Sequence, residues 1–244
     1  MPGTGRTLIA VLGMHRSGTS AIAGMLQEMG VELGPVSERN RFNPRGNREI
    51  VQLNRLHDRV LERSGGSWSR PPERMRARPW DRWSRNRILR TIEGETIGVK
   101  DPRMLICMDF WRDLDPLPIG VIRNPVAVRD SLERRAHERP RKHPQLSGVE
   151  WEALWRTYNR ALLSELRREP FPVIDFDRRA ELDEQARAAL RFHGVEPAGE
   201  SAFFDPGLAA AGDSDWRKQV LEPATLDLWN QLAALSEGAA ARPG

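Results

Sequence analysis

The residues that form disulfides, zinc sites and membrane spans are scarce in this chain. Its 244 residues include a single cysteine, Cys107, so no disulfide can form within the chain. No CxxC motif or cysteine–histidine cluster offers a zinc site. The apolar run at residues 7–12 is too short for a signal peptide, and no later run approaches the about 18 apolar residues that a membrane span requires. We therefore expect a soluble, cytoplasmic protein with no structural metal and no membrane span.

The chain also has only a small excess of positive over negative charge. The 38 Lys and Arg residues exceed the 34 Asp and Glu residues by only four, although the predominance of arginine is accompanied by a sequence pI of about 9.9. This balance favours small phosphate or sulfate ligands over a nucleic-acid-binding stripe, so we expect no nucleic-acid partner. A chain of 244 residues is long enough to bury one good core, and we expect a single domain over residues 1–244.

Four short apolar runs have the pattern of β-strands: residues 7–13, 96–101, 118–123 and 171–176. Segments with helical spacing separate them, and this alternation predicts an α/β domain with a mainly parallel sheet. We expect a P-loop-type, three-layer fold in which helices flank a sheet of four or five strands. Ligands of such sheets bind beyond the carboxyl ends of the strands, and polar residues follow each of the first three runs there.

Three segments repeat apolar residues on one helical face: residues 17–29, 48–63 and 149–168. Gly30 is well placed to end the first of these helices. Residues 64–83 are rich in Gly, Pro, Ser and Arg and show no period, so we expect a surface loop that serves as a lid or contacts a substrate. Residues 237–244 are expected to form a frayed tail.

The sequence GMHRSGTS at residues 13–20 joins the first predicted strand to the first predicted helix. Two glycines separated by four residues, with hydroxyls after them, fit a loop whose backbone N–H groups bind a phosphate at a helix N-terminus. A Walker loop also needs a lysine, to neutralise the outer phosphates of a magnesium nucleotide. Thr19 stands where that lysine is expected, and the strong cation nearby is Arg16. A tight turn that binds no ligand is the alternative interpretation.

A basic residue followed by Ser-Gly-Thr after a strand resembles the sulfotransferases that use 3′-phosphoadenosine 5′-phosphosulfate (PAPS). That family holds the 5′-phosphosulfate in such a loop, and sulfuryl transfer to an alcohol involves neither a γ-phosphate nor magnesium. The resemblance spans roughly residues 7–195 with gaps. It implies PAPS as cofactor, adenosine 3′,5′-bisphosphate as product and no required metal. It assigns cofactor binding in this loop to His15, Arg16, Ser17, Gly18, Thr19 and Ser20.

A second motif of the same family lies in VIRNPVAVRDSL at residues 121–132. The family binds the 3′-phosphate of PAPS with an arginine at a strand end and a serine eight residues later. Arg123 and Ser131 have that order and spacing, and Asn124-Pro125 suits the start of a helix between them. A guanidinium fork and a hydroxyl can make charge-assisted hydrogen bonds to one phosphate. Taken singly, the two residues fit equally well a surface ion pair and an exposed helix serine.

In-line attack on sulfur calls for a base beside the acceptor and a cation beside the leaving nucleotide. The resemblance implies that Arg16 stabilises the leaving bisphosphate and that the base is a His or Glu following the first helix. Glu49 and His57 lie in that segment. Glu49 is the candidate base or a first-turn helix acid, whereas His57 shares a helix face with apolar residues and is expected in the core. His15 is more typical of a supporting role within the loop.

Lys100, Asp101 and Arg103 follow the second predicted strand. Lys100 and Arg103 have the charge to contact a phosphate or the acceptor, with Asp101 orienting one of them. A buried salt bridge that locks the sheet edge explains them equally well, and the sequence leaves both interpretations open. Lys100 completes the predicted catalytic set with Arg16 and Glu49.

Two other stretches match the family in part. The element Asn43-Pro44-Arg45-Gly46 lacks the aromatic and glutamate insert that usually follows it in bacterial relatives. Residues 212–218 resemble the nucleotide lid of cytosolic sulfotransferases apart from an inserted Ser-Asp, which makes Arg217 and Lys218 candidate lid residues.

We therefore predict a PAPS-dependent sulfotransferase that acts on a hydroxyl or amine of a small-molecule, lipid or carbohydrate acceptor. Trp68, Trp80 and Trp83, among arginines, are candidates for an acceptor wall. One alternative is a P-loop kinase or NTPase with a degenerate Walker loop, which predicts magnesium-dependent ATP binding. The other is a non-catalytic nucleotide-binding module, which predicts bisphosphate binding without turnover.

Overall fold

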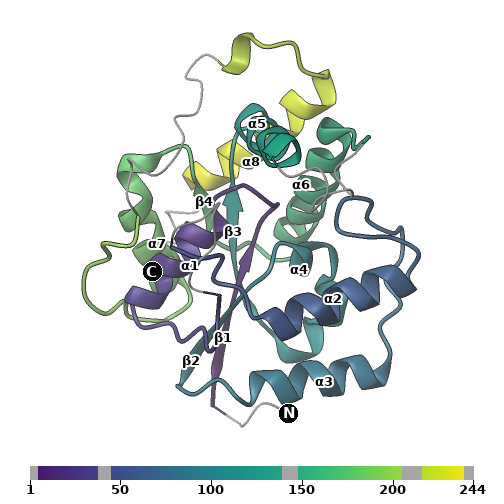
Figure 1. The fold of residues 1–244 in the computed structure, drawn as a ribbon. Helices are drawn as coiled ribbons and strands as arrows, with labels where there is room; N and C mark the ends of the chain where they lie inside the picture. The colour runs from purple at the N-terminus through teal and green to yellow at the C-terminus, as the bar shows by residue number, and fades with distance from the viewer. Residues whose placement is uncertain (1–4, 38–44, 139–147, 205–215, 239–244) are drawn as a thin grey trace.

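The computed structural model describes residues 5–37, 45–138, 148–204 and 216–238. Within them an all-parallel, four-stranded sheet has the order β2-β1-β3-β4, as Figure 1 shows. The prediction of an α/β fold with a mainly parallel sheet is confirmed, and each of the four predicted runs overlaps a strand. The strands are β1 (Thr7–Leu12), β2 (Thr96–Lys100), β3 (Leu117–Ile122) and β4 (Val173–Asp175).

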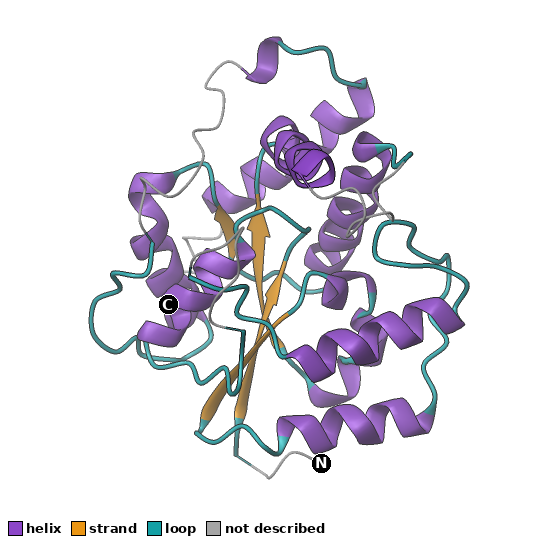
Figure 2. Ribbon diagram, in the orientation of Figure 1, coloured by secondary structure: helices purple, strands orange, loops and turns teal. Residues whose placement is uncertain are grey.

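Helices cover both faces of the sheet (Figure 2), because its strands are apolar on both sides. In β1, Leu8 and Leu12 face one hydrophobic core and Ile9 and Val11 face the other. Residues of α1 and α7 pack in the second core, and residues of α2, α4, α6 and α8 pack in the first. The helices are α1 (Thr19–Glu28), α2 (Val51–Arg63), α3 (Pro79–Leu89), α4 (Arg103–Ile106), α5 (Pro125–Glu138), α6 (Trp151–Arg168), α7 (Leu182–Phe192) and α8 (Pro223–Gly238).

The predicted loop over residues 64–83 ends earlier than expected, because α3 begins at Pro79. Proline suits the first turn of a helix, and the Asp81 carboxylate accepts a hydrogen bond from the Arg78 backbone N–H at 2.8 Å, which caps that turn. The prediction was therefore wrong for residues 79–83. Of the predicted tail, residues 237 and 238 end α8 and the rest lies outside the described residues.

The parallel order brings the loops after β1, β2 and β3 to one edge of the sheet. This edge carries the residues that follow the strands in the sequence: the loop 13–18, the segment 101–103 and residues 123–124. Across the described ranges, no helix combines the length and apolar character needed to cross a membrane.

Candidate functional site

The loop between β1 and α1 lies tightly against its neighbours. A Cβ on Gly13 would lie 2.6 Å from the carbonyl oxygen of Val121 in β3. Gly18 has a φ of 91°, and a Cβ there would lie 2.2 Å from the Phe176 ring. Both glycines of GMHRSGTS are thus required by the path of the loop, which carries the N-terminus of α1 to the carboxyl edge of the sheet.

The start of α1 offers unpaired backbone donors. No side chain caps the helix, and the N–H groups of Gly18, Thr19 and Ser20 have no acceptor among the residues that the structure describes. Arg16 precedes them with a φ of 70°, a left-handed conformation that is costly for a residue with a side chain. Unpaired donors at a helix N-terminus, next to a strained residue, are typical of a site that binds an anion.

Arg16 also connects this loop to α5. Its Nε donates to Ser131 Oγ at 2.8 Å, across 115 positions of sequence. Arg123, which follows β3, donates from a terminal guanidinium nitrogen to the Arg16 carbonyl oxygen at 3.1 Å. The motifs at residues 13–20 and 121–132 therefore meet, since β1 and β3 are neighbours in the sheet.

Positive charge is concentrated where the two motifs meet. Burial lowers the pKa of Arg16 to about 10, and the charged groups that add to this shift are all arginines: Arg135, Arg123 and Arg134. Burial also lowers the pKa of Arg123, whose Nε has no hydrogen-bond partner in the described structure. The carboxylate that pairs with this Nε, that of Asp177, is 3.9 Å away. Partly buried guanidinium groups that lie close to one another repel, and an anion between them would offset that repulsion.

Sequence reasoning missed Arg134 and Arg135 as members of this site. They follow Ser131 by three and four positions on α5, which makes the three residues neighbours on the helix surface. Arg134 contributes to the lowered pKa of both Arg16 and Arg123. The signal available in the sequence is this arginine pair, placed one turn after the serine.

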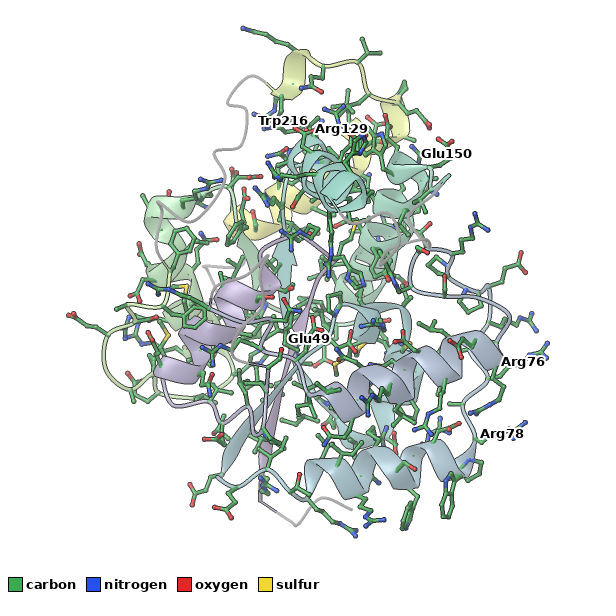
Figure 3. The ribbon with its side chains drawn as sticks, viewed as in Figure 1. Glu49, Arg76, Arg78, Arg129, Glu150 and Trp216 are labelled. Carbon is green, nitrogen blue, oxygen red and sulfur yellow. The ribbon has the colours of Figure 1, made fainter. Side chains whose placement is uncertain are left out.

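On the β2 side of the loop, Lys100 connects α1 to the segment before α2. Its Nζ donates to Glu49 Oε1 at 2.6 Å, to Ser20 Oγ at 3.0 Å and to the Asn47 carbonyl oxygen at 3.1 Å. The other carboxylate oxygen of Glu49 accepts from Asn54 Nδ2 at 2.6 Å. Figure 3 shows Glu49 between α1 and α2. All three N–H groups of Lys100 are engaged, and the Glu49 carboxylate is fixed in orientation.

Asp101, next to Lys100, is the centre of a buried network. Its Oδ1 accepts from Arg103 at 3.0 Å, and its Oδ2 lies 2.7 Å from His57 Nδ1. Trp111 Nε1 donates to His57 Nε2 at 2.9 Å, so His57 carries its proton on Nδ1 and donates it to Asp101. Arg103 also donates to Asp58 at 2.6 Å. The Arg103 charge and the hydrogen bonds from His57 and the Arg103 backbone N–H hold the Asp101 pKa far below its usual range, despite burial. His57 is in the core and fully hydrogen-bonded, and Asp101 and Arg103 form a buried salt bridge.

His15 faces aromatic side chains within the loop. Its ring centroid lies 4.3 Å from that of Trp68 and 5.9 Å from that of Tyr158. Burial, helped by nearby Arg103, lowers its pKa well below the usual value, so the ring is neutral. Of the three tryptophans predicted as an acceptor wall, Trp68 contacts the loop, whereas Trp80 and Trp83 belong to α3 and are 68% and 47% exposed.

The two partial motifs fall partly outside the described residues. Residues 43–44 and 212–215 are not described. Arg45 donates to the carbonyl oxygen of residue 202 at 2.6 Å and to that of residue 203. Trp216 is buried with its ring edge-on to Trp229, and the exposed Arg217 lies with its Cζ 4.9 Å from the Trp216 ring centroid. No group of three or more His, Cys, Asp or Glu side chains that could hold a metal ion occurs among the residues described.

The chain aligns with solved structures of sulfotransferases. The chain aligns with the crystal structure of a sulfotransferase from Alicyclobacillus acidocaldarius over 96% of its own length and 92% of that chain, with a TM-score of 0.53 and 18% sequence identity. A sulfotransferase domain from the Synechococcus PCC 7002 olefin synthase aligns over 100% of this chain and 99% of that one, with a TM-score of 0.48 and 18% identity. No protein-family model and no curated protein matches the sequence. The first alignment shows that the chain has a sulfotransferase fold.

Proposed function

We propose that this protein is a PAPS-dependent sulfotransferase, which transfers a sulfuryl group to a hydroxyl or amine of a small-molecule, lipid or carbohydrate acceptor. The observation that carries the proposal is the meeting of Arg16, Ser131 and Arg123 in a partly buried cluster of arginines. Two motifs that are far apart in the sequence, one suited to a 5′-phosphosulfate and the other to a 3′-phosphate, lie side by side.

The residues at this point fit a nucleotide with phosphates at both positions. The free N–H groups of Gly18, Thr19 and Ser20 suit the anion on the 5′ side. Arg123, with an unpartnered buried Nε, and Ser131 suit the 3′-phosphate. A ligand that carries several negative charges would offset the mutual repulsion of the arginines and hydrogen-bond the orphaned donors.

When bound, PAPS supplies the sulfuryl group that passes to the acceptor. Arg16 keeps a cation next to the 5′ anion site, where it stabilises negative charge on the departing bisphosphate. Its hydrogen bond to Ser131 holds the guanidinium at the junction of the two motifs. Magnesium has no part in this proposal, because arginines provide the positive charge.

Glu49 is the proposed general base that takes the acceptor proton. Its carboxylate lies at the carboxyl edge of the sheet, and Lys100 and Asn54 hold it in one orientation. Because the three donors of Lys100 are already engaged by Ser20, Asn47 and Glu49, we assign Lys100 a positioning role.

Calorimetric titration with adenosine 3′,5′-bisphosphate in a metal-free buffer tests the proposal. We expect the bisphosphate to bind, and Arg123→Ala to weaken it by about 1.5–3 kcal/mol, the range for a hydrogen bond to a charged group. The matched control is Arg129→Ala, which lies on the same helix but pairs with Asp130 and Gln219. Its affinity should equal that of the native chain.

A titration with ATP plus magnesium is the competing measurement. Binding of ATP only in the presence of magnesium, with no binding of the bisphosphate, would contradict the proposal and favour the kinase interpretation. Bisphosphate binding that Arg123→Ala and Arg129→Ala weaken equally would also contradict it.

A further inference from the structure

Positive charge is also concentrated in one segment outside the arginine cluster described above. Residues 70–90 contain eight arginines against two acids, an excess of six, whereas the whole chain has an excess of four. The remainder of the chain is therefore slightly acidic. Of the two acids in the segment, Asp81 is buried and paired with Arg63, which leaves Glu73 as the exposed one.

The helix α3 exposes aromatic residues and buries charged ones. Its inward positions include Asp81, bound to Arg63, and Arg85, which donates to both carboxylate oxygens of Asp113 at 2.9 and 2.8 Å. Its outward positions include Trp80 and Trp83, which are 68% and 47% exposed. The inward charges are thus neutralised within the fold, while two large apolar rings remain in contact with water.

The two exposed indoles form an ordered pair. Their ring centroids are 4.5 Å apart at an interplanar angle of 19°, and Arg87 Cζ lies 5.6 Å from the Trp83 centroid. Trp80, Trp83, Arg87 and Arg90 recur at the spacing of one helix face. Figure 3 shows Arg76 and Arg78 pointing outward at the turn that leads into this helix. We define the α3 face as Trp80, Trp83 and the exposed arginines Arg74, Arg76, Arg78, Arg87 and Arg90.

We propose that the α3 face docks the protein on the surface of a bilayer that contains anionic phospholipids. Tryptophan is favoured at the level of the lipid headgroups, where the ring is apolar and its N–H stays hydrated. Arginines beside it are attracted to anionic headgroups, and their stems tolerate the apolar boundary. This face carries both features together, with one exposed acid in the segment to oppose them.

The geometry favours a bilayer over a sugar chain or another ligand that stacks between aromatic rings. Trp80 and Trp83 already stack on each other, so no slot remains between them, and Arg87 approaches Trp83. A bilayer surface requires no enclosing pocket and takes apolar rings and cations that lie along one helix. The proposal does not depend on the sulfotransferase assignment, because none of these residues belongs to the nucleotide site.

Co-sedimentation of the full chain with lipid vesicles, in the absence of nucleotide, tests the proposal. One set of vesicles contains phosphatidylcholine alone, and the other contains equal parts of phosphatidylcholine and phosphatidylglycerol. We expect binding to the mixed vesicles only, weakened by salt. The triple variant Arg74→Gln, Arg76→Gln, Arg78→Gln should lose about a hundredfold in affinity, since each arginine near an anionic surface contributes about fivefold. The double variant Trp80→Ser, Trp83→Ser should also bind more weakly.

Matched variants distinguish docking through the α3 face from nonspecific attraction by exposed residues elsewhere on the protein. Arg160→Gln, Arg168→Gln, Arg191→Gln removes three exposed arginines elsewhere, and Val220→Ser removes an apolar side chain that is 99% exposed. Both should bind the mixed vesicles as the native chain does, and circular dichroism should show that every variant is folded. The proposal is overturned if the mixed vesicles do not bind, or if the matched variants lose as much as the α3-face variants. Binding to heparin but not to vesicles, with sensitivity to the same arginines, would also overturn it and identify a polysaccharide partner.

Discussion

Two sides of the sheet edge hold buried positive charge in opposite ways. On the β2 side, Lys100 pairs with Glu49, and Arg103 pairs with Asp101 and Asp58. On the β1–β3 side, Arg16 has no carboxylate among the groups that shift its pKa, only other arginines. Cations that have acids beside them are satisfied within the fold and stabilise it. Arginines that lie close together, with no acid beside Arg16 in the described structure, favour an anionic ligand, and this difference supports the proposed anion site.

Two aspartates at strand ends show the same contrast. Asp101 follows β2, and despite complete burial its pKa is held far below the usual range by Arg103 and His57. Asp175 ends β4, and burial, with a contribution from nearby Asp177, raises its pKa to about 6. The Asp101 carboxylate is ionised because Arg103 and His57 are positioned to bind it. Ionisation of Asp175 is costly because burial removes its carboxylate from water.

The largest predicted effect is on the β2 side. Asp101→Asn removes the carboxylate that Arg103 and His57 share and leaves buried donors without their charged acceptor. We expect a loss of about 3–5 kcal/mol in the free energy of unfolding, measured by urea denaturation at neutral pH. The low pKa of Asp101 in the folded state means that this stabilisation is present at neutral pH and is lost as the pH falls below about 4. Asp130→Asn, which breaks an exposed pair with Arg129, is the control and should cost less than about 1 kcal/mol.

A second prediction concerns the pH dependence of stability at Asp175. Its pKa is higher in the folded than in the unfolded chain, so the folded state binds the proton more tightly and stability falls as the pH rises from about 4 to about 6. The full effect is about 3 kcal/mol. Asp175→Asn should remove this fall while keeping the hydrogen bond from the Asp177 N–H. Urea denaturation at a series of pH values measures it, and an unchanged pH profile in the variant would contradict the assignment.

The third prediction is that Arg16→Gln separates binding from stability. It removes one charge from the arginine cluster, so we expect the free energy of unfolding to stay the same or to rise. Affinity for adenosine 3′,5′-bisphosphate should fall by about 1.5–3 kcal/mol. Parallel urea denaturation and calorimetry test the pair of effects. A variant that loses stability while binding normally would place Arg16 with the structural cations of the β2 side.

The smallest predicted effect is that of Ser131→Ala. The substitution deletes the acceptor of the Arg16 Nε hydrogen bond and one predicted contact to the nucleotide. We expect a loss of about 0.5–1.5 kcal/mol in bisphosphate affinity by calorimetry. Ser164→Ala, at an exposed position of α6, is the control and should have no effect.

Much of the fold could be predicted because its strands are short, apolar and followed by polar loops. The run at residues 7–12 and the glycines of the following loop fixed β1 and the path into α1. The start of α3 was missed because its outward face is aromatic and its inward face is charged, which reverses the usual pattern of a surface helix.

The candidate site was only partly predictable. Arg123 and Ser131 were predicted from the resemblance of one continuous motif to that of the sulfotransferases, and the structure brings them to Arg16. The contact between Lys100 and Glu49 joins separate segments of the chain, and neither residue's own surroundings in the sequence indicates the other. Whether Asp101 and Arg103 pair with each other or contact a ligand likewise depends on what the fold places around them.

The most direct test of the account compares the affinities of adenosine 3′,5′-bisphosphate and adenosine 5′-monophosphate, measured by calorimetry without metal on the native chain and on Arg123→Ala. The account predicts that the native chain prefers the bisphosphate by about 1.5–3 kcal/mol and that the variant loses most of this preference. Equal affinity for the two nucleotides in the native chain, or a preference that the variant retains in full, would contradict the assignment of the arginine cluster to a PAPS site.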